Sequence, residues 1–454
     1  MSMKSINPAT GEESGSFEEY DTEKVVNIIE QVHQAWQGWR HVPTQERGTR
    51  FVSLAQLLRA RSEELARLMA LEMGKPITQG RGEIEKCALV CEYYAQQAPA
   101  MLADQPVASD ASRSYVTFCP LGVVLAVMPW NFPFWQVFRF AAPALMAGNA
   151  ALLKHSSNVP RCALAIEALF VEAGLPGNVF RTLLIGSGGV DGVVEHPHVR
   201  AVTLTGSELA GRKVAARAGQ MLKKTVLELG GSDPFIVTPG ADLALAAQVG
   251  ARARCQNSGQ SCIAAKRFIV FDEVYEEFLG LFKEAMAKLV VGDPLVENTQ
   301  VGPQARGDLR EELHQQVQAS VAAGARLVLG GMELDRPGFF YAPTILAEVA
   351  PDMPAYHEEL FGPVASVIRV ADVEQAVAVA NDTPYGLGGS VWDRDTVRAE
   401  ALAIRIEAGA VFINGMVKSD PRLPFGGIKD SGYGRELSHY GLMEFVNIQT
   451  VWIA

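Results

Sequence analysis

Apolar side chains follow two different spacings along the chain, and the spacing changes beyond about residue 103. From Thr22 to about Ala103 they recur three and four positions apart, as at Val25, Ile28 and Ile29, which is typical of amphipathic helices. Farther along, short apolar runs alternate with helical stretches. Because strands that alternate with helices form parallel sheets covered on both faces, this pattern predicts an α/β protein with a helical lead-in.

The apolar runs continue on both sides of about Gly230, where a second α/β stretch begins. We expect strands at 123–127, 150–153, 202–204, 235–237, 268–270, 326–329 and 364–368. The sequence therefore predicts two α/β lobes with a cleft between them.

Two further predicted strands, 114–118 and 447–453, stand apart from this alternation. The second is apolar and aromatic and lies at the end of the chain. Such a strand is prone to edge-to-edge pairing unless another segment covers it, so we expect a subunit interface here.

The composition narrows the classes of partner. With 48% apolar and 20% charged residues, the chain of 454 residues has the make-up of an ordinary globular protein of two or three domains. Its net charge of −11 disfavours a protein that holds nucleic acid or anionic membranes by bulk charge. Six cysteines without a CxxC pair suggest a reducing compartment, and neither a signal peptide nor an apolar membrane span is apparent. We expect a cytoplasmic protein.

One cysteine has unusual neighbours. Cys262 ends the small, polar segment 256–261 and is followed by Lys266 and Arg267. An accessible thiol near positive charge favours the thiolate, which makes Cys262 the candidate nucleophile. A packed, unreactive cysteine, as we expect for Cys87 and Cys91, is the alternative.

Glu228 is the candidate general base. It lies between two leucines at the end of a predicted strand, where an unpaired charge is costly. Burial there would raise its pKa toward neutrality, which suits a base. A solvated or ion-paired glutamate is the alternative.

Two places could bind a phosphate or a ribose. The segment 205–207 closes a strand and opens a helix, where backbone N–H groups attract anions, although Ser207 could also be an ordinary helix cap. Lys154 lies at the carboxyl end of strand 150–153, where ligands of parallel sheets bind, but alone it could equally be a surface residue. The segment 206–213 departs from a P-loop at its lysine, which disfavours a nucleotide triphosphatase.

Metal ligation is not indicated. Glu195, His196 and His198 are close in sequence, but no further ligand follows at a fixed spacing. We therefore expect no metal site.

Six motifs, in order and along nearly the whole chain, together resemble the aldehyde dehydrogenase superfamily. They are Pro129-Trp130-Asn131-Phe132-Pro133, Thr205-Gly206-Ser207, Glu228-Leu229-Gly230-Gly231, Gly259-Gln260-Ser261-Cys262, Glu359-Leu360-Phe361-Gly362-Pro363 and Pro424-Phe425-Gly426-Gly427. The interval from Glu228 to Cys262 matches the family's spacing between base and nucleophile. Segments 229–235 and 434–439 look most like bacterial succinate-semialdehyde dehydrogenases.

The resemblance implies a fold in three parts. Two doubly wound α/β lobes would be a Rossmann-like cofactor-binding domain, formed by 1–105 and 120–229, and a catalytic domain, 230–430. A small β oligomerisation arm would comprise 106–119 and 431–454, which would account for both isolated strands. A homo-oligomer, a dimer or a tetramer, is expected.

The resemblance also implies a mechanism. Cys262 would attack the aldehyde, the Asn131 amide and the Cys262 backbone N–H would hold the oxyanion, and Glu228 would activate water to hydrolyse the thioester. The cofactor would be NAD, with NADP also accepted. By motif matching, the cofactor-binding residues are Trp130, Lys154, His155, Ser156, Ser157, Gly206, Ser207, Leu229, Glu359 and Phe361.

Two departures from the family pattern bear on specificity. Strict NAD users commonly have glutamate three places after the cofactor lysine, where this chain has Ser157, so repulsion of a 2′-phosphate is reduced and we expect dual use with NAD preferred. Arg139 and Ser419 match positions that semialdehyde enzymes use for the substrate carboxylate, whereas Gln256 stands where many of them have arginine. Succinate semialdehyde is the expected substrate.

Three alternatives stay open. A glutarate-semialdehyde or general aliphatic aldehyde dehydrogenase would use the same residues. The presence of Glu228 argues against a CoA-acylating relative. The joint presence of Asn131, Glu228 and Cys262 argues against a catalytically silent homologue.

Overall fold

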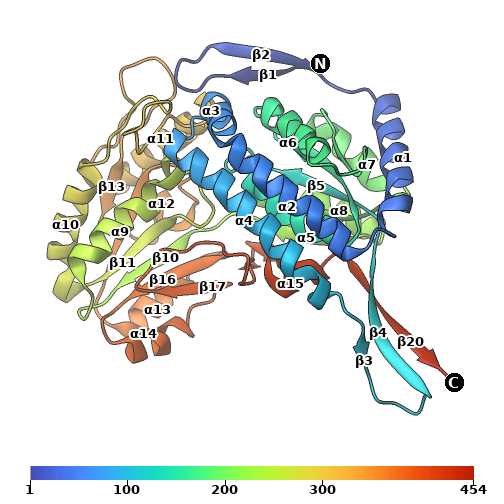
Figure 1. Cartoon of the computed structure of the whole chain (residues 1–454). Coiled ribbons are helices and arrows are strands. Elements are labelled where there is room, and N and C mark those ends of the chain that lie inside the picture. Colours follow the sequence, from blue (N-terminus) through green and yellow to red (C-terminus); the bar gives the residue numbers. More distant parts are fainter. Residues whose placement is uncertain (1) are drawn as a thin grey trace.

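The computed structural model describes residues 2–454 and has two large sheets, each with helices packed against it (Figure 1). The predicted α/β class is confirmed. The helical lead-in is also confirmed, as four helices over residues 22–101. These are α1 (Thr22–Trp39), α2 (Thr44–Ala60), α3 (Ser62–Met73) and α4 (Ile77–Met101).

The first sheet has six strands in the order β19-β9-β8-β5-β6-β7. They are β5 (Val123–Met128), β6 (Ala150–His155), β7 (Phe180–Thr182), β8 (Val199–Thr205), β9 (Lys224–Glu228) and β19 (Gly432–Tyr433). All pairs are parallel except β19 with β9. The chain runs outward from β5 to β7 and then returns to β8, so the strand order reverses between β5 and β8. In open parallel sheets this switch point is where ligands bind.

Besides α1, which packs against β5, β6 and β7, five further helices belong to the first lobe. They are α5 (Trp135–Met146), α6 (Pro160–Glu172), α7 (Val190–Glu195), α8 (Glu208–Gln220) and, near the end of the chain, α15 (Ser438–Met443). The start of α5 is fixed by a buried carboxylate, because Glu83 of α4 accepts hydrogen bonds of 2.9 Å from the backbone N–H groups of Phe134 and Trp135. This contact ties the helical lead-in to the loop that follows β5.

The second sheet has seven strands in the order β12-β13-β14-β11-β10-β16-β17, with only β12 antiparallel to its neighbour. They are β10 (Asp233–Val237), β11 (Ala265–Phe271), β12 (Arg326–Leu329), β13 (Thr344–Ala347), β14 (Val364–Val370), β16 (Gly388–Trp392) and β17 (Ala410–Ile413). The associated helices are α9 (Leu243–Cys255), α10 (Tyr275–Ala287), α11 (Gly307–Ala322), α12 (Pro354–His357), α13 (Val373–Asn381) and α14 (Thr396–Ala403), with 3₁₀ turns η2 (Gln256–Gly259) and η3 (Asp272–Val274).

A three-stranded sheet projects away from both lobes and carries the C-terminus (Figure 1). It consists of β3 (Gln105–Pro106), β4 (Arg113–Pro120) and β20 (Val446–Ile453), with β4 and β20 antiparallel over eight residue pairs. Both isolated strands predicted from the sequence are therefore present, and they pair with each other. The segment 431–454 also contributes β19 and α15 to the first lobe before β20 begins.

The sequence pattern did not predict several short or glycine-rich strands. The strands β7, β13, β16 and β17 have three to five residues, too few to establish a periodicity. Other small elements are the hairpin β1 (Ser2–Ile6) with β2 (Glu13–Glu18), the turn η1 (Ser187–Gly189), and the pair β15 (Tyr385–Gly386) with β18 (Ile428–Lys429). Within residues 2–454, no helix combines the length and apolarity needed to cross a membrane.

Candidate active site

A strained loop carries Cys262 from α9 into β11. Asn257 and Ser258 have φ of 54° and 57°, and Gly259 has φ of 77°. A Cβ on Gly259 would collide with the backbone of Gly362, so this position requires glycine. Three consecutive left-handed residues persist only where their surroundings hold them, and such strain gathers at functional sites.

Asn131 is held against this loop by a network of amides. Its side-chain Nδ2 donates to the Gln260 carbonyl (3.1 Å), and its Oδ1 accepts from Gln136 Nε2 (3.5 Å). The side chain of Asn257 donates to the Asn131 carbonyl (2.7 Å). Because these bonds orient the amide, one N–H of Asn131 Nδ2 is left to donate to a ligand.

Of the two cations that the sequence placed near Cys262, Lys266 lies beside it, whereas Arg267 donates to backbone carbonyls elsewhere, and the pKa of the thiol moves the other way. Lys266 Nζ donates to the carbonyls of Ser261 and Cys262 at 2.9 Å, and Lys266 and Arg139 both lower the pKa of the thiol. Burial outweighs them and raises that pKa to about 12. This direction runs against the expected resting thiolate, whereas the expected accessibility agrees with the structure, in which the Cys262 side chain is half-buried and lines a cleft.

Glu228 ends β9 inside the protein, without a hydrogen-bond partner for either carboxylate oxygen among residues 2–454. Burial raises its pKa well above the usual range, Arg139 lowers it and Glu436 raises it. A Cβ on Gly426 would approach Glu228 Oε1 to 2.8 Å, so glycine keeps space beside the carboxylate. The environment is that of a general base rather than of a solvated surface glutamate.

Arg139 of α5 already has an acidic partner. Its guanidinium forms a buried ion pair with Glu436 and donates to Thr205 Oγ1 at 3.2 Å. Its charge also acts on Glu228 and Cys262. This geometry favours a charge that tunes the catalytic groups over the predicted role in binding a substrate carboxylate.

Ser419, the other residue predicted to bind the carboxylate, lies elsewhere. Its Oγ accepts from Lys86 Nζ (2.6 Å) and from Trp135 Nε1 (3.1 Å). Neither Arg139 nor Ser419 lines the cleft that contains Cys262.

Cys262 and Asn131 line a cleft of about 490 Å³ at the switch point of the first sheet. The same cleft is lined by most of the predicted cofactor residues. These are Trp130, Gly206, Ser207, Leu229, Glu359 and Phe361. The structure thus brings the candidate nucleophile and the candidate cofactor residues together.

The cleft offers groups suited to a dinucleotide. Ser207 accepts from the Ala210 N–H (3.4 Å) as the N-cap of α8, so a helix N-terminus opens at the cleft. Glu359 Oε1 accepts from the Gly231 N–H and pairs with Lys266, both at 3.1 Å, which leaves Oε2 to accept from a ribose hydroxyl. Trp130 and Phe361 meet edge to face, with ring centroids 5.8 Å apart. An anion site, an acceptor and an aromatic wall fit NAD(P).

The four predicted cofactor residues around the end of β6 do not line this cleft. Lys154 is largely buried, which lowers its pKa, while Ser156 is half-buried and Ser157 is exposed. His155 is buried, with its Nε2 2.9 Å from the Pro133 carbonyl and its Nδ1 accepting from the Ser156 N–H at 2.9 Å. Burial lowers the pKa of His155 to about 4, so this imidazole is neutral and fixes the loop rather than contacting a ligand.

Sequence reasoning missed several residues of the site. Asn257, Gln260 and Glu436 lie inside motifs that were recognised, but nothing in the sequence indicates that their side chains are buried. Gln136 could have been found, since it is a polar residue within an otherwise apolar stretch of α5. Among residues 2–454 no group of three or more His, Cys, Asp or Glu side chains is arranged to hold a metal ion.

Comparison with known proteins agrees with the geometry. The model of the aldehyde dehydrogenase family matches residues 1–451. The chain is 53% identical over 454 residues to the probable NADP(+) succinate-semialdehyde dehydrogenase of Synechocystis sp. and 50% identical over 457 residues to NADP(+) succinate-semialdehyde dehydrogenase 1 of Mycobacterium tuberculosis, with 100% of both chains covered in each case.

A solved structure at lower sequence identity has nearly the same fold. The succinic semialdehyde dehydrogenase of Streptococcus pyogenes, in complex with NADP+, superposes with a TM-score of 0.97 at 39% identity, over 99% of each chain. Since the family model spans nearly the whole sequence, and the relatives match along their full length, the chain belongs to the aldehyde dehydrogenase family.

Proposed function

We propose that the protein oxidises succinate semialdehyde to succinate with NAD(P). The observation that carries the proposal is the joining of Cys262 and Asn131 in one cleft with the predicted cofactor residues. The names of the relatives at 50–53% identity supply the substrate. Glutarate semialdehyde is the second candidate, because the cavity described below has a volume of about 960 Å³ and would admit a longer chain.

The chemistry follows from the residues. The Cys262 thiol gives up its proton to solvent, and Sγ forms a bond to the aldehyde carbon while the carbonyl π electrons move onto the oxygen. The resulting oxyanion is held by the Asn131 amide and by the Cys262 backbone N–H, which has no partner among residues 2–454. NAD(P), held by cleft residues such as Trp130, Ser207 and Glu359, would supply the hydride acceptor that turns this adduct into the thioester. Glu228 then takes a proton from water, and the resulting hydroxide displaces the Cys262 thiolate from the thioester to release the acid.

Steady-state kinetics with purified protein tests the proposal. We expect kcat/KM for succinate semialdehyde to exceed that for butanal by at least about 100-fold. A site with a partner for the substrate carboxylate discriminates strongly against an aldehyde that lacks this group. Glutarate semialdehyde, measured in parallel, decides between the two semialdehydes. Equal values for butanal and both semialdehydes would identify a general aliphatic aldehyde dehydrogenase.

We propose that both dinucleotides are accepted. Their order stays a prediction: the sequence argument favours NAD, whereas the names of the relatives carry NADP(+). Ser157 is exposed beyond β6, so a charge introduced there leaves the core intact. Ser157→Glu should lower kcat/KM for NADP by about 10-fold or more and change that for NAD little, because a carboxylate repels the 2′-phosphate. If kcat/KM falls equally for NADP and NAD, Ser157 does not belong to the cofactor site.

We propose a homo-oligomer assembled through the arm. Three apolar side chains of β20 are exposed, Ile448 (62%), Trp452 (53%) and Ile453 (41%), as expected for a strand that a second copy covers. Light scattering should give a dimer or tetramer, and Ile448→Lys with Trp452→Lys should lower the mass. A monomeric wild-type protein would contradict the proposal.

Six free cysteines agree with the expected cytoplasmic location, which fractionation of the source cells would test.

A further inference from the structure

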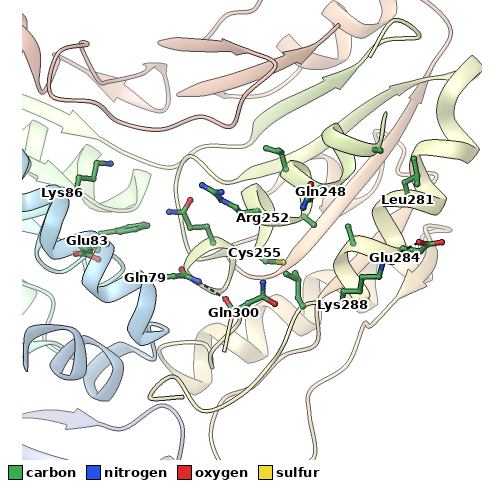
Figure 2. A pocket seen from close by; sticks show the side chains of 18 of the residues that line it. Gln79, Glu83, Lys86, Gln248, Arg252, Cys255, Leu281, Glu284, Lys288 and Gln300 are labelled. Atoms are coloured by element: carbon green, nitrogen blue, oxygen red, sulfur yellow. Dashed lines mark hydrogen bonds and ion pairs between the residues drawn. The ribbon is translucent and has the colours of Figure 1, made fainter. Parts of the chain in front are cut away.

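A second cavity, of about 960 Å³, lies between α4 and α9 (Figure 2). Phe132, which directly follows Asn131, and Trp135, which opens α5, form part of its wall. Cys255 and Gln256, where the strained loop of Cys262 begins, form another part. The cavity and the cofactor cleft therefore lie against the same two segments, those that carry Asn131 and Cys262.

Lys86 of α4 brings a positive charge to this cavity without an acidic partner. Within residues 2–454 it forms no ion pair, and its ammonium lies 4.2 Å from the centroid of the Trp135 ring. The nearby acids are engaged elsewhere: Glu83 pairs with Lys75 and caps α5, and Asp420 pairs with Arg422 at 2.6 Å. One N–H of Lys86 donates to Ser419, so two remain for a ligand.

Ser419 does not itself line the cavity but holds the Lys86 ammonium from behind. Its Oγ accepts from both Lys86 and Trp135, which occupies both of its lone pairs, and the residue is only 7% exposed. The hydroxyl proton has no acceptor among residues 2–454. Ser419 thus orients the Lys86 ammonium, whose two remaining N–H groups can donate to the two oxygens of a carboxylate.

Other charges of the cavity fit an anionic ligand. In Figure 2 the Lys86 ammonium on α4 and the Arg252 guanidinium on α9 extend toward the cavity from opposite walls. Arg252 forms no ion pair within the described residues, whereas Lys288 lies 3.9 Å from Glu284. Arg139 is absent from the cavity lining and is paired with Glu436.

We propose that the Lys86 ammonium, oriented by Ser419, binds the carboxylate of the semialdehyde, which makes Lys86 a specificity-determining residue. This inference rests on the proposed function and identifies the group that selects its substrate. Lys86 takes the place that the sequence gave to Arg139.

The test compares Lys86→Met with wild type on succinate semialdehyde and on butanal, which has the same carbon count without the carboxylate. We expect KM for the semialdehyde to rise roughly 10- to 100-fold, because a charge-assisted hydrogen bond is lost, and the kinetic constants for butanal to change far less. Lys86→Arg should restore part of the selectivity. Lys288→Met, in the same cavity, is the matched control and should leave both substrates unchanged.

The outcomes are distinguishable. If wild type oxidises both aldehydes equally well, the proposed function fails. If wild type favours the semialdehyde and Lys86→Met keeps that preference, the assignment of Lys86 is overturned and the proposed function stands. If Lys86→Met does not fold, Ser419→Ala decides: a rise in KM confined to the semialdehyde supports the carboxylate site, and an equal change for both aldehydes overturns it.

Discussion

The two hollows that flank the catalytic loop differ in how they are built. The cofactor cleft lies at the carboxyl ends of β5 and β8 and is made from loops, a helix N-terminus and backbone groups. The cavity between α4 and α9 is made from helix faces, and its distinctive group is one ammonium without a countercharge. The difference separates two tasks: the strand ends position the reacting atoms, whereas the helix faces select the aldehyde. Variants on the two sides should therefore change different kinetic constants.

The largest effect is expected for Glu228→Gln, at the end of β9 next to the cleft, which Glu228 itself does not line. Removal of the base should lower kcat by about 100- to 10,000-fold for every aldehyde, because water is no longer deprotonated. Hydride transfer precedes this step, so a burst of about one reduced cofactor per site should remain in rapid-mixing measurements. A lost burst would show that Glu228 is needed before the thioester forms.

Asn131→Ala should have the next largest effect. Loss of one oxyanion donor costs roughly 100- to 1000-fold in kcat. The Asn131 carbonyl that accepts from Asn257 remains, so the loop should keep its place and thermal unfolding should be nearly unchanged. A variant with full activity on semialdehyde and butanal would exclude Asn131 from the oxyanion site.

Arg139→Met sharpens the comparison, because the sequence placed Arg139 with the substrate carboxylate. Since Arg139 lowers the pKa of Glu228, its loss should shift the pH profile of kcat to higher pH and reduce kcat about 10-fold at neutral pH, equally for both aldehydes. If KM rises for the semialdehyde and not for butanal, Arg139 binds the substrate carboxylate, as the sequence predicted.

A smaller effect is expected from pH alone on the cavity side. Burial, and then the charge of Arg139 on α5, lower the pKa of Lys86 to about 8, against the opposing charges of Cys87 and Glu83 on α4 and of Asp420. The cation that binds a carboxylate is present below this pKa and lost above it. The ratio of kcat/KM for semialdehyde to that for butanal should therefore fall by up to about 10-fold between pH 7 and 9, whereas Lys86→Arg should hold it constant. Because both aldehydes react with the same Cys262 and Glu228, titration of these two groups changes both kcat/KM values alike and leaves their ratio unchanged.

The sequence predicted the cleft better than the cavity for a physical reason. Asn131, Glu228 and Cys262 lie in motifs at strand ends, where the backbone itself dictates which residues fit. Lys86 is one lysine on a long helix, and its neighbour Ser419 is 333 positions away. Nothing local distinguishes it from a solvated surface charge.

Burial and distant pairing account for the other misses. Lys266 was foreseen near Cys262, but Arg139 was expected in another role and Arg267 lies elsewhere. Desolvation decides the direction of the pKa shift, and desolvation depends on the whole fold. Likewise Arg139 and Glu436 are each visible in the sequence, but their pairing brings α5 together with the segment that precedes α15.

The most direct test of the separation is the ratio of kcat/KM for succinate semialdehyde to that for butanal in three proteins: wild type, Glu228→Gln and Lys86→Met. The account predicts a ratio of about 100 or more in wild type, the same ratio in Glu228→Gln despite its low kcat, and a ratio reduced roughly 10- to 100-fold in Lys86→Met. A ratio that falls in Glu228→Gln, or survives in Lys86→Met, would contradict the division of chemistry and selectivity between the two hollows.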